Sequence, residues 1–108
     1  MNNHGKKTDQ KMKPCLVYEY LMRYSNVNHV VSANELVGYL QECGISAERR
    51  SIYKDIEEIN KALLLIQRDG YGIPRAETIE EAEELLQDDK EKTIKYKFDT
   101  KKYIYNEA

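Results

Sequence analysis

Apolar residues recur at helical spacing through the first part of the chain. After a polar N-terminal stretch, the first run places Leu16, Val17, Tyr20, Leu21 and Tyr24 on one face. A residue every three or four positions on one face is typical of an amphipathic helix, and a proline such as Pro14 is tolerated in its first turn. The pattern therefore predicts a helix that begins near Lys13 and packs into the core.

A second helix is predicted after Ser32. Ser32 and Glu35 have the spacing of a capping box, in which the serine side chain accepts a hydrogen bond from the amide of the glutamate. Gly44 supplies a residue that can end this helix. The apolar face between these two signals consists of Leu36, Val37 and Leu40.

A third helix is predicted to cover residues 46–62, with the side chain of Ser46 at its start. Ile45, in the turn before it, can fill the space between the second and third helices. The apolar run Leu63–Ile66 either prolongs this helix or begins a buried strand, because periodicity alone does not separate the two. The predicted apolar face of the helix consists of Ile52, Ile56 and Ile59.

The pattern changes twice in the second half of the chain. Asp69–Pro74 is turn-forming, and Thr78 with Glu81 makes a second capping box. A short helix follows, whose apolar side consists of Ile79, Ala82, Leu85 and Leu86. Lysines then alternate with Ile94, Tyr96 and Phe98, and Tyr103–Tyr105 can pair back, which predicts a β-hairpin with lysines at its tip.

These elements predict an α+β fold that is mainly α. The expected architecture is a winged helix-turn-helix, with three helices, a C-terminal β-hairpin wing and a short inserted acidic helix. Residues 1–12 are expected to be a disordered basic leader, and residues 13–108 to form the winged domain. Within that domain the insert covers residues 69–92 and the wing covers residues 93–106.

The third helix has two interpretations. At about 100° per residue, Arg50, Lys54 and Lys61 point away from the isoleucine face, and Tyr53 lies at its edge. A helix that is anchored by apolar side chains and presents basic and polar residues is what reading of the DNA major groove requires. The alternative is an ordinary amphipathic helix with a solvated face.

The residues around this helix also resemble a known family. The run from Leu36 to Ile56, which includes Gly44-Ile45-Ser46 and ends in Tyr53-Lys54-Asp55-Ile56, is similar to the N-terminal DNA-binding domain of bacterial WYL-domain transcriptional regulators. Tyr20-Leu21, Tyr24 and Ser32-Ala33-Asn34-Glu35 share the likeness, which covers most of residues 15–60. In typical members a large WYL sensor domain follows, whereas this sequence ends at Ala108, so a truncated regulator or a free-standing winged domain is expected.

The resemblance implies, position by position, a set of DNA-facing residues. Arg50 suits a guanine edge, because a guanidinium pairs with it bidentately, and Lys54 suits either a base or a phosphate. Arg49 lies near the apolar face and is expected to form an ion pair with a carboxylate. The DNA-facing set is Ser46, Arg50, Ser51, Tyr53 and Lys54 on the helix, and Lys95, Lys97, Lys101 and Lys102 on the wing, where solvated lysines are the alternative.

The charged residues are distributed unevenly along the chain. The net charge is −2, but residues 1–61 carry nine Lys and Arg against eight Asp and Glu, and residues 62–108 carry eight against eleven. Most of the acidic residues lie in Glu77–Glu91. The remainder of the chain is basic, so the overall charge does not argue against DNA.

The sequence also makes several classes of protein improbable. No apolar run is long enough to cross a membrane and no signal peptide is recognised, so a cytoplasmic protein without a membrane partner is expected. An enzyme is not expected, because no Ser-His-Asp or Cys-His grouping and no phosphate-binding glycine loop occurs. Neither a cofactor nor a metal is expected. Cys15 and Cys43 are predicted to be buried free thiols, in preference to a disulfide or reactive thiols.

Two functions remain. The first is a transcriptional regulator that reads double-stranded DNA with helix 46–62 and touches its backbone with the wing, as a homodimer joined through Leu63–Ile66 or the apolar side of residues 79–86. The second is a free-standing winged-helix protein of a phage or mobile element that binds a protein, for example as an anti-CRISPR-type inhibitor, with or without regulating its own operon. The partner surface would then be a phosphate-like row of Glu80, Glu81, Glu83 and Glu84, whose alternative is a solvated face.

Overall fold

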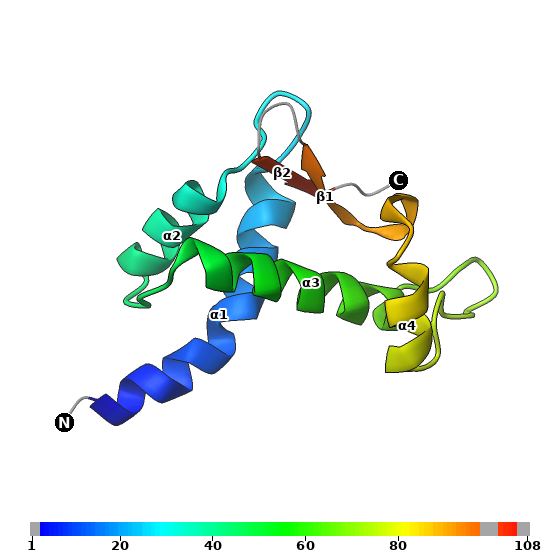
Figure 1. The fold of residues 1–108 in the computed structure, drawn as a ribbon, viewed down its shortest axis with the longest axis horizontal. Coiled ribbons are helices and arrows are strands. Elements are labelled where there is room, and N and C mark those ends of the chain that lie inside the picture. Colours follow the sequence, from blue (N-terminus) through cyan, green and yellow to red (C-terminus); the bar gives the residue numbers. More distant parts are fainter. Residues whose placement is uncertain (1–2, 98–101, 106–108) are drawn as a thin grey trace.

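The fold is described from a computed structural model, which places the backbone of residues 3–97 and 102–105 and the side chains of residues 10–95. It confirms an α+β chain that is mainly helical (Figure 1). The elements in chain order are α1 (Asn3–Tyr24), α2 (Ala33–Glu42), α3 (Arg49–Ile66), α4 (Ile79–Leu85), a 3-10 turn η1 (Asp89–Glu91), β1 (Ile94–Lys97) and β2 (Lys102–Tyr105).

The main core lies where α1, α2 and α3 meet, with α3 crossing α1 (Figure 1). The centres of the predicted apolar faces are confirmed, since their side chains are buried. Ile45, in the turn between α2 and α3, is also buried and fills the space between these helices as expected. The prediction for Tyr24 is wrong: it ends α1 and is 47% exposed. The largest fully buried side chains of this core are Val17, Leu21, Val31, Leu36, Leu40, Ile52 and Ile94.

Helix α1 is longer than the sequence pattern predicts. It begins at Asn3 and includes Pro14, so residues 3–12 of the expected disordered leader are helical. Two contacts with α3 and the turn before it account for this extension. Lys13 is buried and forms an ion pair with Asp55 of α3, and the side chain of Gln10 donates a hydrogen bond to the carbonyl of Ser46 at 3.1 Å. Tertiary contacts here outweigh the weak local preference of the segment.

Helix α2 begins and ends where predicted. The Ser32 hydroxyl oxygen accepts a hydrogen bond from the Glu35 amide at 3.0 Å, and Gly44 has a φ of +93° just beyond the helix. The carboxylate of Glu35 does not close a capping box. It accepts instead from the hydroxyl of Tyr20 at 2.6 Å, and it lies 3.2 Å from His29.

Helix α3 begins later than predicted. Its N-cap is Glu48, whose side chain makes no capping hydrogen bond, and Ser46 is not the cap. The chain stays non-helical from Ile45, which is held in the core, so the first helical residue is Arg49. At its other end the helix continues to Ile66, which resolves the ambiguity over Leu63–Ile66 in favour of helix.

A second, smaller cluster holds α4 against the C-terminal half of α3. Leu64, Ala76 and Ala82 are its buried members, with Leu65, Leu85 and Leu86 packed on them. Thr78 caps α4 as predicted, since its hydroxyl accepts from the Glu81 amide at 3.1 Å. The prediction for Ile79 is wrong. This residue starts α4 and is 60% exposed, because Ala82 rather than Ile79 faces the cluster.

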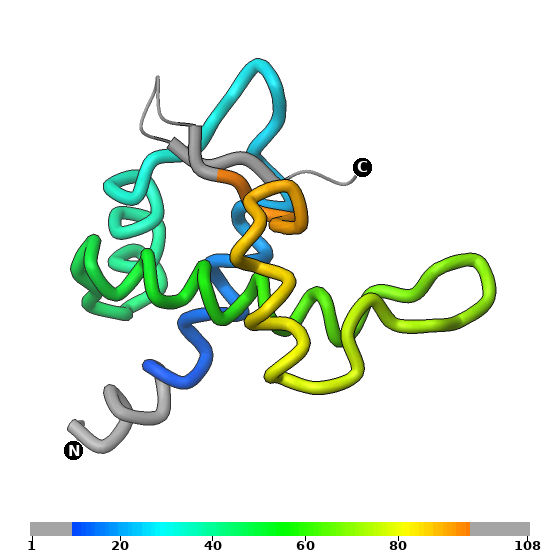
Figure 2. The backbone as a smooth tube through the Cα atoms, turned by 45° about the vertical axis from the view of Figure 1, so that its right-hand side comes forward, coloured from blue at the N-terminus to red at the C-terminus, as the bar shows by residue number. Residues whose placement is uncertain are grey.

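The predicted turn and hairpin are both present. The Asp69 carboxylate accepts hydrogen bonds from the amides of Tyr71 and Ile73, which lower the pKa of that carboxyl; Figure 2 shows this segment projecting as a loop. Strands β1 and β2 are antiparallel, with Ile94 opposite Tyr105, and β2 lies against α1. The tip of the hairpin, residues 98–101, lies outside the described residues. No helix in the described part of the chain is long and apolar enough to span a membrane.

Candidate nucleic-acid interface

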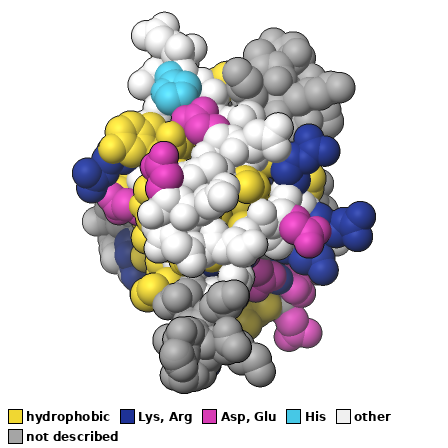
Figure 3. Space-filling view, turned by 90° about the vertical axis from the view of Figure 1, so that its left-hand side faces the viewer, with side chains coloured by type: hydrophobic (Ala, Val, Ile, Leu, Met, Phe, Trp, Pro, Cys, Tyr) yellow, Lys and Arg dark blue, Asp and Glu magenta, His cyan; other side chains and the backbone are white. Residues whose placement is uncertain are grey.

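Four of the predicted DNA-facing residues meet at the start of α3. Ser46, Arg50, Ser51 and Lys54 line one shallow depression together with Gln10, Ala47 and Glu48. Arg50 and Lys54 are one helical turn apart and are both exposed, as predicted from the apolar periodicity. Figure 3 looks onto the end of the molecule where α3 begins, and shows Lys and Arg side chains gathered along its right-hand edge, with carboxylates among them.

The three cations in the first turns of α3, Arg49, Arg50 and Lys54, make no ion pair within the described side chains. Of the nine other Lys and Arg whose side chains are described, five are paired: Lys13 with Asp55, Arg23 with Glu19, Lys61 with Glu58 and Glu83, Arg75 with Glu91, and Lys92 with Asp89. Lys11, Arg68, Lys90 and Lys95 are, like the α3 cations, without an ion pair there, but they do not form a group on one helix. A cation without a protein partner keeps its full charge available to an external anion.

Arg49 was expected to form an ion pair, and no carboxylate among the described residues lies within reach of it. It occupies the first turn of α3 and is exposed, because Ile52 and not Arg49 turns into the core. Arg49 therefore adds a third cation beside Arg50 and Lys54. The first amides of α3 have no side-chain cap, and the positive end of the helix dipole lies at the same place.

Asp55 belongs to the same helix and yet does not oppose these cations. Its carboxylate points to α1, where Lys13 neutralises it, and the two side chains are 14% and 7% exposed. On α3, the ammonium of Lys54 therefore faces solvent, whereas the carboxylate of the neighbouring Asp55 faces α1 inside the protein. The pair of Lys13 and Asp55 was not predicted from the sequence, where the only indication of it is the position of Asp55 directly before the buried Ile56.

Ser51 and Tyr53 fit the predicted set less well. The Ser51 hydroxyl donates to the carbonyl of Glu48 at 2.8 Å, so it cannot at the same time donate to a phosphate. Tyr53 does not share the depression of Arg50 and Lys54. It lines a separate groove between α3, α4 and β1, together with Lys61, Glu83, Gln87 and Lys92.

The hairpin lysines are only partly described. Lys95 is half-buried and follows Ile94, which is 1% exposed. Lys97 and Lys102 are opposite each other in the strand register, and their side chains, like the whole of Lys101, lie outside the described part of the structure.

The predicted acidic surface on α4 is exposed but partly occupied by contacts within the protein. Glu81 accepts a hydrogen bond from the Glu77 amide at 2.7 Å, and Glu83 lies 3.3 Å from the ammonium of Lys61. Glu80 and Glu84 are therefore the two carboxylates of the row that make no hydrogen bond or ion pair within the described part of the protein.

Asn60, a buried polar residue on α3, was not predicted from the sequence. Asn60 is 4% exposed, and its side chain makes three hydrogen bonds to the backbone of Thr93 and Ile94. It follows Ile59 and lies one turn after Ile56, so an amide at this edge of the apolar face was the available signal.

The prediction for the cysteines is confirmed for their free state and wrong for their burial. Cys15 and Cys43 are both free thiols, but both are exposed. Each lies on the outer side of its segment, because α1 and α2 turn larger apolar side chains such as Val17 and Leu40 into the core. Beside Cys43, hydrogen bonding to its thiol and partial burial raise the pKa of the Tyr39 hydroxyl.

No relative of this protein was found among known proteins. No protein-family model matches this sequence, and neither the curated proteins nor the solved structures contain a match. The likeness to the DNA-binding domain of WYL regulators therefore rests on the residues quoted above.

Proposed function

We propose that this chain is a DNA-binding transcriptional regulator with a winged helix-turn-helix fold. In this proposal α2, the turn at Gly44 and α3 form the helix-turn-helix, and the β1–β2 hairpin is the wing. The order of the elements and the buried contacts of α3 support this assignment. The observation that carries the proposal is a group of three cations on the first turns of α3, Arg49, Arg50 and Lys54, which have no ion pair among the described residues.

The proposed contacts follow from the chemistry of each group. Arg50 reads a guanine edge, since its guanidinium offers two parallel donors. Lys54, one turn further on, and Arg49 contact bases or phosphates, and the uncapped amides of α3 suit a phosphate oxygen. The Tyr53 groove and the paired Lys61 lie outside this set. The lysines of the wing contact the neighbouring backbone.

A homodimer is proposed as well, because one reading helix covers only a few base pairs. The structure narrows the candidate surfaces. Leu63 and Leu64 are buried within the monomer, and Ala82 is too. The most exposed residues of the two expected surfaces are Ile66 at the end of α3 and Ile79 at the start of α4, at 64% and 60%, whereas Leu65, Leu85 and Leu86 are half-buried.

The proposal is tested by selecting bound duplexes from a random DNA pool and measuring their affinity by fluorescence anisotropy. Arg50→Ala is expected to cost about 1–3 kcal/mol on the selected duplex and to relax specificity at one position. The matched control is Arg68→Ala, an exposed arginine beyond the far end of α3 that makes no ion pair within the described residues. Equal losses for the two variants, or no enrichment from the pool even at low salt, would contradict the proposal.

Binding of a protein partner through α4 is the second candidate, and Glu80 and Glu84 are the observation in its favour. The double charge reversal Glu80→Lys/Glu84→Lys would abolish a complex held by these carboxylates and leave DNA affinity unchanged or improved. An unchanged complex would show that α4 does not act as a mimic of a phosphate backbone.

A further inference from the structure

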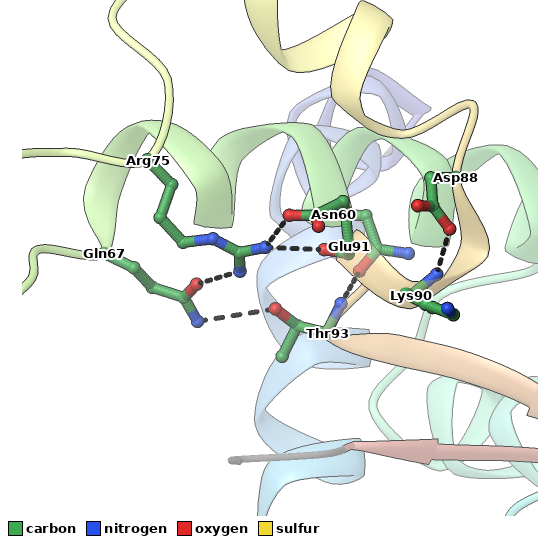
Figure 4. Close-up of polar contacts among 7 residues, drawn as sticks. All are labelled: Asn60, Gln67, Arg75, Asp88, Lys90, Glu91 and Thr93. Atoms are coloured by element: carbon green, nitrogen blue, oxygen red, sulfur yellow. Dashed lines mark hydrogen bonds and ion pairs between the residues drawn. The ribbon is translucent and has the colours of Figure 1, made fainter.

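Asn60 connects α3 to the first strand of the hairpin. Its side-chain oxygen accepts hydrogen bonds from the amides of Thr93 at 3.1 Å and Ile94 at 2.8 Å. Its side-chain nitrogen donates to the carbonyl of Ile94 at 3.1 Å. Figure 4 shows the asparagine reaching from α3 to the segment that enters β1. A buried amide with three backbone partners holds that segment in one position.

These bonds occupy the place of a neighbouring strand. The amide and the carbonyl of one strand residue point to the same side, and Ile94 directs both of them to Asn60. On its other edge β1 pairs with β2, where Ile94 is opposite Tyr105. The side chain of Ile94 is 1% exposed and belongs to the main core, so the base of the hairpin is fixed in two directions.

An outer layer of contacts surrounds the same point. Gln67 donates to the hydroxyl of Thr93 at 3.4 Å, and Arg75 donates to the side-chain oxygen of Gln67 at 3.2 Å while forming an ion pair with Glu91 (Figure 4). Gln67, Arg75 and Glu91 are more exposed than Asn60, so solvent weakens their contribution. Asn60 is the buried side chain of α3 that holds this segment.

We infer that Asn60 is a positioning residue of the proposed DNA-binding surface. It holds the wing at a fixed angle to α3, so that the wing lysines and the cations of α3 meet one duplex together. A two-stranded hairpin is marginally stable by itself, and ordering it on binding would reduce affinity. Asn60 has no contact with DNA in this arrangement. The inference rests on the proposed function, which is tested separately by the wild-type protein.

The experiment is a double-mutant cycle on DNA affinity between Asn60→Ala and the pair Lys97→Ala/Lys102→Ala. In the wild-type background, loss of the two lysines is expected to lower the slope of log affinity against log salt by about 1.8, at 0.9 for each phosphate contact. In the Asn60→Ala background, removal of the two lysines is expected to change the slope by less than about 0.5. Without Asn60 the wing is not held beside α3, so its lysines no longer contact the phosphates. The control Asn28→Ala, in the exposed loop before α2, should leave the effect of the lysines intact.

Asn60→Asp tests the donor separately. It keeps the one oxygen that accepts from the Thr93 and Ile94 amides, but it replaces the nitrogen that donates to the Ile94 carbonyl with a second oxygen. The lysine effect is therefore expected to stay reduced, as in Asn60→Ala. Equal lysine effects in the wild-type and Asn60→Ala backgrounds would overturn the inference.

A second measurement needs no DNA. Hydrogen exchange of the Thr93 and Ile94 amides is expected to accelerate at least about tenfold in Asn60→Ala, while the amides of Leu21 and Leu36 in the three-helix core keep their protection. Unchanged exchange at Ile94 would overturn the inference even if DNA binding were intact. Conversely, a wild-type protein that binds no DNA would refute the proposed function, and the exchange result would still decide whether Asn60 holds the hairpin.

Discussion

At the residue scale, the polar contacts of α3 decide which charges are available to a partner. Asp55 and Lys13 neutralise each other inside the protein, and Lys61 is held by Glu58 and Glu83. Arg50 and Lys54 have no such partner among the described residues. Periodicity predicted that these two side chains are exposed. It could not predict the pair with Lys13, because that pair depends on how α1 crosses α3, which is a tertiary property.

Breaking the buried pair should destabilise the fold strongly. Lys13→Met leaves the Asp55 carboxylate buried without a counter-charge, and the expected loss is about 3–5 kcal/mol in the free energy of unfolding by urea. The double variant Lys13→Met/Asp55→Leu should recover most of this loss, since no buried charge remains. A single variant as stable as the wild type would show that the pair is solvated.

A second residue-scale prediction concerns Tyr20. The hydrogen bond that its hydroxyl donates to Glu35, with partial burial, raises its pKa to about 12. The raised pKa means that folding favours the protonated phenol, so this contribution to stability is complete below about pH 10, the usual pKa, and is lost as the pH rises towards 12. Unfolding by urea at a series of alkaline pH values should therefore show a steeper loss in the wild type than in Tyr20→Phe. Parallel profiles for the two proteins would contradict this assignment.

At the scale of elements, local signals predicted two of the three helix caps and the end of α2, but not the start of α1 or of α3. Ser32 and Thr78 cap α2 and α4 as their spacing predicts, and Gly44 ends α2. The start of α1 was misplaced by ten positions, from Lys13 to Asn3, because contacts of Lys13 and Gln10 with distant residues stabilise a segment of weak helical preference. The role of Asn60 has the same origin: it serves a strand 34 positions away.

Gly44, in the turn between α2 and α3, and Gly38, within α2, give a matched pair of glycine variants. A side chain at Gly44 would meet no atom within 4 Å, yet the φ of +93° strains any other residue, so Gly44→Ala is expected to cost about 1–2 kcal/mol of unfolding free energy. Gly38 lies exposed within α2, where an added methyl group also meets no atom within 4 Å, and Gly38→Ala should stabilise the protein by up to about 1 kcal/mol. Changes of the same sign in both variants would contradict the backbone explanation.

At the scale of the whole molecule, the distribution of charge matters more than its sum. The net charge of −2 would by itself argue against a nucleic-acid partner. The acidic helix α4 packs through its apolar side on the C-terminal half of α3, where Glu83 pairs with Lys61. The cations without an ion pair among the described residues occupy the N-terminal half of α3. The sequence indicated this division through its acidic segment Glu77–Glu91. The pairing of individual charges required the three-dimensional arrangement.

The salt dependence of DNA affinity tests the central proposal most directly. Fluorescence anisotropy would compare the wild type with Arg50→Ala/Lys54→Ala and with the control Arg68→Ala/Lys90→Ala, which has the same net charge. In the α3 variant the slope of log affinity against log salt is expected to fall by about 0.9, for one phosphate contact of Lys54. Its affinity is expected to fall by a further amount of about 1–3 kcal/mol for the base contact of Arg50, while the control keeps the wild-type slope and affinity. Equal slopes in the two variants would contradict the central proposal, because the cations of α3 would then be an ordinary solvated face.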